Sequence, residues 1–221
     1  MLGRNLSSHE KSQLHTFLGT ERYRLKLIFR DLQAPVMSEV AGEYDAQLLD
    51  QGDRLGSYVT RKIFGAKGPW IGKAFRPLSD TSGEGYNAFG SVKNRTTMLP
   101  MDTYIGPSAI VPGHSYVLDY RNKNWGPIRW LKGELRQASP NLLLGMGTFG
   151  PRVRNLHKLR RVIPFVLVRS DRPYLPEKNT AVTQHIIRRP PHSPDTPFSG
   201  RRRSLNEGSR VPLPVAAGST A

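Results

Sequence analysis

Apolar residues near the start of the chain recur at the spacing of a helix. Between residues 5 and 33 they lie mostly three or four positions apart, as on one side of an α-helix. They are Leu14, Phe17, Leu18, Leu25 and Phe29. Ser7 or Ser8 can act as an N-cap. The pattern predicts one or two amphipathic helices, which form an N-terminal helical arm over residues 1–33.

A different pattern follows between residues 40 and 170. The apolar runs are short, rich in β-branched and aromatic residues, and separated by clusters of Gly, Pro, Asn and Asp. A spacing of about 10 to 15 residues between such runs is typical of antiparallel barrels and sandwiches. The runs are GEYDAQLL, GPWIGKAF, GYNAFG, PMDTYIG, SYVLDY, GELRQ, NLLLGMGTF and IPFVLV. We therefore predict a mainly β fold, with an antiparallel β-barrel domain over residues 34–172.

Residues 173–221 have the composition of a disordered tail. Pro, Ser and Arg dominate this segment, as in RRPPHSPDTPFSG, and few apolar residues are available to form a core. We expect a disordered basic tail that folds into no further domain.

Composition narrows the class of protein. The chain has 221 residues, enough for one domain with appendages, and it has no cysteine. The lack of cysteine excludes disulfides, thiolate metal sites and a cysteine nucleophile. We expect neither a signal peptide nor a transmembrane segment, because charges occur throughout the first residues and a span needs about 20 apolar residues. The sequence therefore favours a cytoplasmic protein.

The net charge of +16 is partly concentrated in the segment 152–161. Its cations are Arg152, Arg154, Lys158, Arg160 and Arg161. Such a patch attracts phosphate groups, but no recognition helix or aromatic platform accompanies it. We expect at most weak, non-specific contact with anions or an acidic membrane surface, and no specific nucleic acid partner. A solvated basic face is the alternative.

The stretch LLLGMGTFG has the G-x-G-x-x-G spacing of a dinucleotide-binding loop. A second strand-like run follows and ends on Asp171, near the place of the acidic residue that holds a ribose hydroxyl. A Rossmann domain needs further parallel strands, which the pattern lacks. We therefore prefer a β-strand with Gly145 and Gly147 on one side, where a bulky group passes close. The less favoured interpretation is an NADP-dependent reductase, with Arg169 or Arg172 at the 2′-phosphate.

The order of the short motifs resembles a group of uncharacterised bacterial proteins. These have a G-x-W-x-G start and a W-x-G-K-x-F segment, and they are regarded as lipocalin-like barrels of the calycin group. The resemblance covers residues 29–170 and rests on GEYDA at 42–46 and GPWIGKAF at 68–75. Here Tyr44 and Ala46 replace the first-motif Trp and second Gly. The resemblance implies that the aromatic residue of the first motif closes one end of the barrel beneath an arginine from a late strand.

Charged residues on two predicted strands are candidates for chemistry. A period of two places Asp119 with Arg121 on one face of one strand, and Glu134 with Arg136 on one face of the next. If these strands are neighbours, the four side chains could converge at the barrel mouth and orient a ligand head group. The alternative is a solvent-facing ladder of salt bridges. A carboxylate in the lumen would have a raised pKa and could act as a base.

These features favour binding of a small hydrophobic or fatty-acid-like molecule in the barrel cavity. The alternative is an isomerase or proton-transfer enzyme with Asp119 or Glu134 as base, so the question of enzyme or binding protein stays open. The histidines never recur at metal-ligand spacing, and we expect neither metal nor cofactor. The candidate ligand-binding residues are Trp70, Lys73, Tyr86, Asp119, Arg121, Glu134, Arg136, Gly145 and Gly147.

Overall fold

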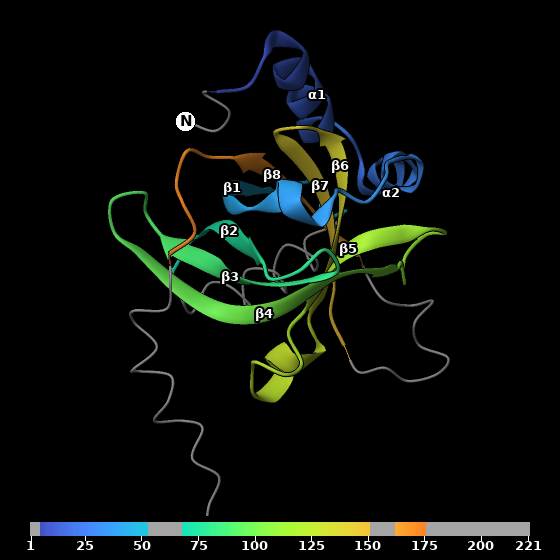
Figure 1. The fold of residues 1–221 in the computed structure, drawn as a ribbon. Helices are drawn as coiled ribbons and strands as arrows, with labels where there is room; N and C mark the ends of the chain where they lie inside the picture. Colours follow the sequence, from blue (N-terminus) through green and yellow to red (C-terminus); the bar gives the residue numbers. More distant parts are fainter. Residues whose placement is uncertain (1–4, 53–67, 151–161, 176–221) are drawn as a thin grey trace, which may run out of the picture. The chain divides into compact units, whose positions relative to one another are not determined.

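The computed structural model of the protein describes residues 5–52, 68–150 and 162–175. Within these ranges, eight antiparallel strands form a closed barrel in which consecutive strands pair and β8 returns to β1 (Figure 1). The strands are β1 Gly42–Leu48, β2 Trp70–Pro77, β3 Ser82–Gly90, β4 Arg95–Pro107, β5 His114–Asp119, β6 Lys132–Ser139, β7 Leu142–Thr148 and β8 Val162–Arg169. The predicted antiparallel barrel is confirmed.

Two helices precede the barrel, α1 Ser8–Leu18 and α2 Arg22–Asp31. Ser7 is the N-cap of α1, because its hydroxyl accepts a hydrogen bond from the Glu10 amide at 3.3 Å. The Glu10 carboxylate in turn accepts one from the Ser7 amide at 2.9 Å, which completes a capping box. None of the helices that the structure describes is long and apolar enough to cross a membrane.

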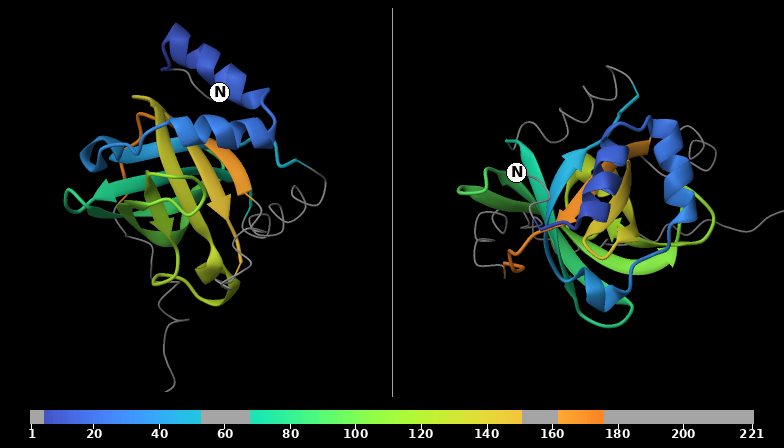
Figure 2. Two further views of the ribbon diagram at one scale, coloured as in Figure 1. Left: turned by 90° about the vertical axis from the view of Figure 1, so that its right-hand side faces the viewer. Right: turned by 90° about the horizontal axis from the view of Figure 1, so that it is seen from above.

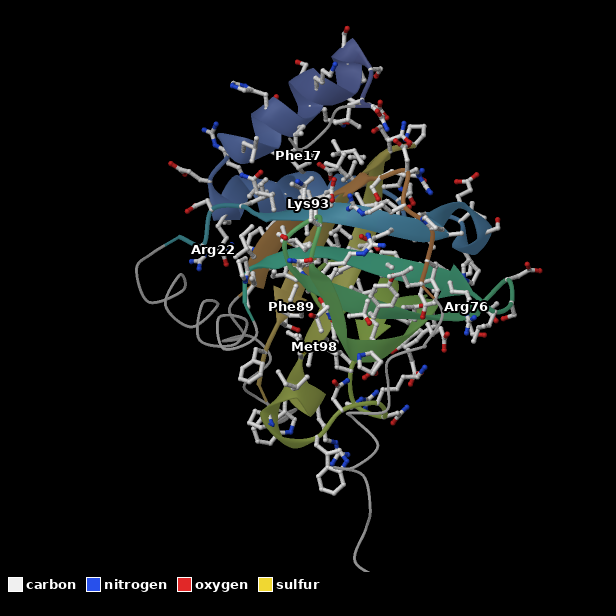
Figure 3. All side chains as sticks on the ribbon, turned by 90° about the vertical axis from the view of Figure 1, so that its left-hand side faces the viewer. Phe17, Arg22, Arg76, Phe89, Lys93 and Met98 are labelled. Carbon is white, nitrogen blue, oxygen red and sulfur yellow. The ribbon has the colours of Figure 1, made fainter. Side chains whose placement is uncertain are left out.

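Both helices lie on the same side of the barrel (Figure 2). Their buried apolar residues form one cluster with outward-facing side chains of β7 and β8, and Phe17 lies between α1 and the strands (Figure 3). The helix residues in this cluster are Leu14, Phe17, Leu25 and Phe29. The spacing seen in the sequence therefore corresponds to the face that packs on the barrel, except for Leu18, which is exposed.

A second cluster fills the interior of the barrel, and it contains alternate residues of every strand. At one end, the short 3₁₀ helix η1 Met37–Val40 leads into β1 and contributes both of its terminal side chains to the cluster. Three aromatic rings of this cluster pack next to one another. The ring centroid of Tyr44 lies 5.7 Å from that of Phe75, which lies 5.4 Å from that of Tyr116. Side chains thus occupy this end of the lumen.

The LLLGMGTFG stretch forms β7, which pairs antiparallel with both β6 and β8. A dinucleotide-binding βαβ unit requires its two strands to be parallel, so that interpretation is wrong for this fold. Leu142, Leu144 and Met146 face the helices, as the alternation predicts. Gly145 lies beneath a ring of β8, since a Cβ atom there would come within 2.2 Å of the Phe165 side chain. The glycine therefore makes room for a neighbouring aromatic residue.

Two predicted segments lie outside the described residues. These are the basic segment 152–161 and the tail beyond residue 175. The described chain continues through Tyr174, whose ring lies 4.9 Å from that of Tyr86 on β3.

Candidate functional site

A pocket opens at the end of the barrel opposite Tyr44. Its wall comes from the last residues of β1 and β7, the first residues of β2, β6 and β8, and the segment after β5. In an up-and-down antiparallel barrel these positions all meet at the same end. The lining residues are Leu48, Trp70, Lys73, Tyr120, Leu131, Lys132, Gly133, Gly147, Ile163 and Phe165. The cavity itself is small, about 20 Å³, which is room for roughly one water molecule, and it opens to solvent.

Lys73 is the buried polar residue at the centre of this wall, with 4% of its surface exposed. Its Nζ donates hydrogen bonds to Asn87 Oδ1 at 2.6 Å and to the Tyr120 hydroxyl at 2.7 Å. Asn87 Nδ2 donates to the same hydroxyl at 3.0 Å. Three buried side chains, from β2, β3 and the residue that follows β5, therefore form a closed hydrogen-bonded triad.

Aromatic rings surround the amine of Lys73. Its Nζ lies 5.2 Å from the ring centroid of Trp70, 5.4 Å from that of Tyr120 and 5.6 Å from that of Phe165. The ring of Trp70 meets that of Phe165 edge-on at 5.6 Å. Ring faces at these distances attract a cation, and the apolar wall keeps water away.

The charge of Lys73 has no acidic partner among the described residues, because no carboxylate there lies within ion-pair distance of its amine. Burial removes water from the ammonium group and lowers the pKa of Lys73 to about 7. Lys132 in the same pocket differs, since its Nζ lies 3.3 Å from a carboxylate oxygen of Asp119. The pocket thus combines an unpaired buried amine with an ion-paired one.

Asp119 lies on the outer face of the barrel, while its neighbours Leu118 and Tyr120 belong to the interior cluster. Its carboxylate accepts hydrogen bonds from Arg121, the shortest at 2.6 Å. Burial alone would raise the pKa of Asp119, but the hydrogen bonds from Arg121 and the charge of Lys132 outweigh it and lower the pKa to about 2. The expectation of a raised pKa is wrong for this carboxylate.

Glu134 and Arg136 also lie on the outer face, and each holds a different segment. Glu134 accepts hydrogen bonds from the Ser108 hydroxyl and from the Ala109 amide, the latter at 2.8 Å, and so fixes the β4–β5 loop. Arg136 caps the end of α2. Its guanidinium donates to the backbone carbonyls of Phe29, Arg30, Leu32 and Pro112. The four charged candidates therefore do not meet at the pocket.

Tyr86 is an outward-facing residue of β3. Its hydroxyl donates to a carboxylate oxygen of Glu43 at 3.3 Å, and its ring packs on Tyr174. The Glu43 carboxylate, which is buried, also accepts hydrogen bonds from Arg95 and Arg172. This network fastens the described end of the chain to the outside of β1 and β3.

Among the predicted site residues, Trp70, Lys73 and Gly147 line the pocket and Gly145 lies just behind it. The sequence analysis did not select Tyr120. The alternation of apolar residues could have identified it, because Tyr120 falls on the same face as the inward-facing Tyr116 and Leu118. Other site residues missed by the sequence analysis are Asn87 and the pocket-lining Leu48, Leu131, Lys132, Gly133, Ile163 and Phe165. Asn87 is opposite Lys73 only through the register of β2 and β3. No simple sequence pattern predicts that pairing.

No group of three or more acidic or histidine side chains in the described parts of the chain is arranged to hold a metal ion. No protein-family model and no curated protein matches the sequence. Among solved structures, the fold is similar to that of a protein from Thermomonospora curvata, with a TM-score of 0.49 and 11% sequence identity. The similarity covers 73% of this chain and 96% of that chain.

Proposed function

We propose that the barrel binds a small, largely apolar molecule whose polar end reaches Lys73. The observation that carries this proposal is the amine of Lys73, which is buried in the pocket and whose hydrogen-bond partners in the described part of the chain are the uncharged Asn87 and Tyr120. A buried amine without an ion partner loses hydration energy that a polar ligand group can restore. The apolar walls then hold the body of the ligand.

A fatty-acid-like molecule has the required chemistry. Its carboxylate would favour the charged form of Lys73, and its chain would lie against Trp70, Phe165 and Ile163. The cavity of about 20 Å³ is far smaller than the roughly 300–1,000 Å³ of small-molecule sites, so the pocket has to widen to admit an alkyl chain. Short chains therefore fit the proposal better than long ones.

Membership in the lipocalin-like calycin group is part of the same proposal. It is supported by Tyr44, which is fully buried with the Arg169 guanidinium over its ring. This is the contact that the resemblance implies for the aromatic residue of the first motif. An enzyme with Asp119 or Glu134 as base has less support, because both carboxylates lie on the outer face and are held by other groups.

Octanoate is a suitable probe, with the fluorescence of Trp70 as the readout. The exposed residues Trp125 and Trp130 are replaced by Phe in the parent protein so that Trp70 alone reports. We expect saturable binding that weakens by about 10- to 100-fold in Lys73→Met, as for the loss of one charge-assisted hydrogen bond. Lys132→Met is the matched control, since it removes the ion-paired lysine of the same pocket, and it should change the affinity by less than about three-fold. Equal affinity of the parent and Lys73→Met would contradict the proposal.

A further inference from the structure

The amine of Lys73 has the surroundings of a nucleophile as well as those of a binding group. It is enclosed by Trp70, Tyr120 and Phe165, and its two hydrogen-bond partners are uncharged. We propose that Lys73 reacts reversibly with small apolar aldehydes in this pocket to form an imine. This inference rests on the proposed binding function and names a chemical class of ligand for the same site.

An amine attacks a carbonyl carbon only in its uncharged form, and the site favours that form. Within the described residues, the titratable groups that line the pocket with Lys73 are Tyr120, whose pKa burial raises, and Lys132, whose amine is ion-paired with Asp119. With a pKa of about 7, roughly half of the Lys73 amines are uncharged at pH 7. For an exposed lysine the uncharged fraction is roughly a thousand-fold smaller. Desolvation of this kind is one way in which proteins activate lysine.

The reaction needs no oxidant and no cofactor. The nitrogen of Lys73 forms a bond to the carbonyl carbon, and the carbonyl oxygen gains a proton to become the hydroxyl of a carbinolamine. This hydroxyl leaves as water, the nitrogen loses its protons, and a carbon–nitrogen double bond remains. The Tyr120 hydroxyl, 2.7 Å from Nζ, is placed to move protons between the nitrogen and the departing oxygen.

The same rings that surround the amine also suit the product. A protonated imine is a cation at the position of Nζ, where three ring centroids lie between 5.2 and 5.6 Å away. Leu131, Ile163 and Phe165 provide an apolar wall for the alkyl chain and limit the access of water that would hydrolyse the imine. The pocket therefore offers a nucleophile, a proton carrier and a site for the chain.

Reductive trapping in the full-length protein tests the inference. The protein is incubated at pH 7 with octanal and cyanoborohydride, which delivers hydride to the imine carbon and leaves a stable secondary amine. Peptide mass mapping then gives the rate of alkylation at each lysine. We expect Lys73 to be alkylated at least about ten-fold faster than Lys132 and the exposed Lys93. Alkylation of Lys73 at or below the rate of these two lysines would overturn the inference.

Two further measurements separate this inference from the proposed function. Octanoate should slow the trapping of octanal at Lys73, because both occupy the same pocket. Tyr120→Phe should slow trapping by about ten-fold while changing octanoate affinity by only a few-fold, since it removes the proton carrier and keeps the ring. If octanoate binds through Lys73 but octanal is not trapped there, only this inference fails. If neither probe enters the pocket, the proposed function fails with it.

Discussion

The guanidinium carbon of Arg169 lies 4.9 Å from the ring centroid of Tyr44, and the two residues are directly paired between β8 and β1. Arg169 also donates hydrogen bonds to the backbone carbonyls of Glu39 and Ala41, the latter at 2.7 Å. A single side chain thus connects the last strand, the first strand and the 3₁₀ helix that leads into it. These contacts join the three elements at one end of the barrel.

Replacing Arg169 with Met should lower the free energy of unfolding by about 1–2 kcal/mol. The change removes a cation–π contact and two charge-assisted hydrogen bonds at a partly exposed site. Urea denaturation measures the effect. Arg24→Met is the matched control, because Arg24 is an exposed residue of α2, and it should change stability by less than about 0.5 kcal/mol. Similar losses in the two variants would show that the contacts of Arg169 do not stabilise this end of the barrel.

Two buried tyrosines should respond in opposite ways to removal of their hydroxyl groups. The Tyr44 hydroxyl has no hydrogen-bond partner within the described ranges, so Tyr44→Phe should leave stability unchanged or raise it by up to about 1 kcal/mol. The Tyr116 hydroxyl donates to Thr103 Oγ1 at 2.9 Å, and Tyr116→Phe should cost about 1 kcal/mol. Thermal and urea unfolding of both variants check the prediction. A clear loss in Tyr44→Phe would reveal a partner for its hydroxyl.

The two glycines of β7 should differ in their tolerance of a methyl group. A Cβ atom at Gly145 would lie 2.2 Å from the ring of Phe165, which also packs edge-on against Trp70, so Gly145→Ala should destabilise the barrel by roughly 1–3 kcal/mol. At Gly147 the nearest atom would be Ile163 Cβ at 3.4 Å, and Gly147→Ala should cost less than about 1 kcal/mol. Gly147→Ala also adds a methyl group to the pocket wall, so this variant should bind octanoate more weakly. Equal stability of the two variants would contradict the position assigned to Phe165.

The buried amine of Lys73 should make stability depend on pH. Its pKa is about 7 in the folded protein and 10.5 ordinarily, so between these values the unfolded chain holds a proton that the folded protein has lost. Stability therefore rises with pH across this window. Below about pH 7 the amine is charged in both states, and the folded protein is destabilised by the full free-energy cost of burying that charge. Between pH 7 and pH 9, the free energy of unfolding of the wild type should rise by about 2 kcal/mol relative to that of Lys73→Met. Parallel pH profiles of the two proteins would show that Lys73 titrates normally.

Local patterns were enough to predict the elements of this fold. The N-cap at Ser7 and the helical spacing around Phe17 depend on interactions within a few residues, which neighbouring positions in the sequence specify. The antiparallel strands follow from short apolar runs between turn residues. The alternation in LLLGMGTFG likewise places Gly145 and Gly147 on one side of β7, whatever lies beside it.

Tertiary structure decided which face of each strand became the interior. A period of two separates Asp119 from Tyr120 but treats the two faces alike, and only closure of the barrel between β1 and β8 turned Tyr120 inward and Asp119 outward. The triad of Lys73, Asn87 and Tyr120 comes from β2, β3 and the residue that follows β5, and its members meet through strand register and curvature. Burial of Lys73, and with it the lowered pKa of its amine, is likewise a property of the closed barrel, because desolvation depends on every wall of the pocket at once.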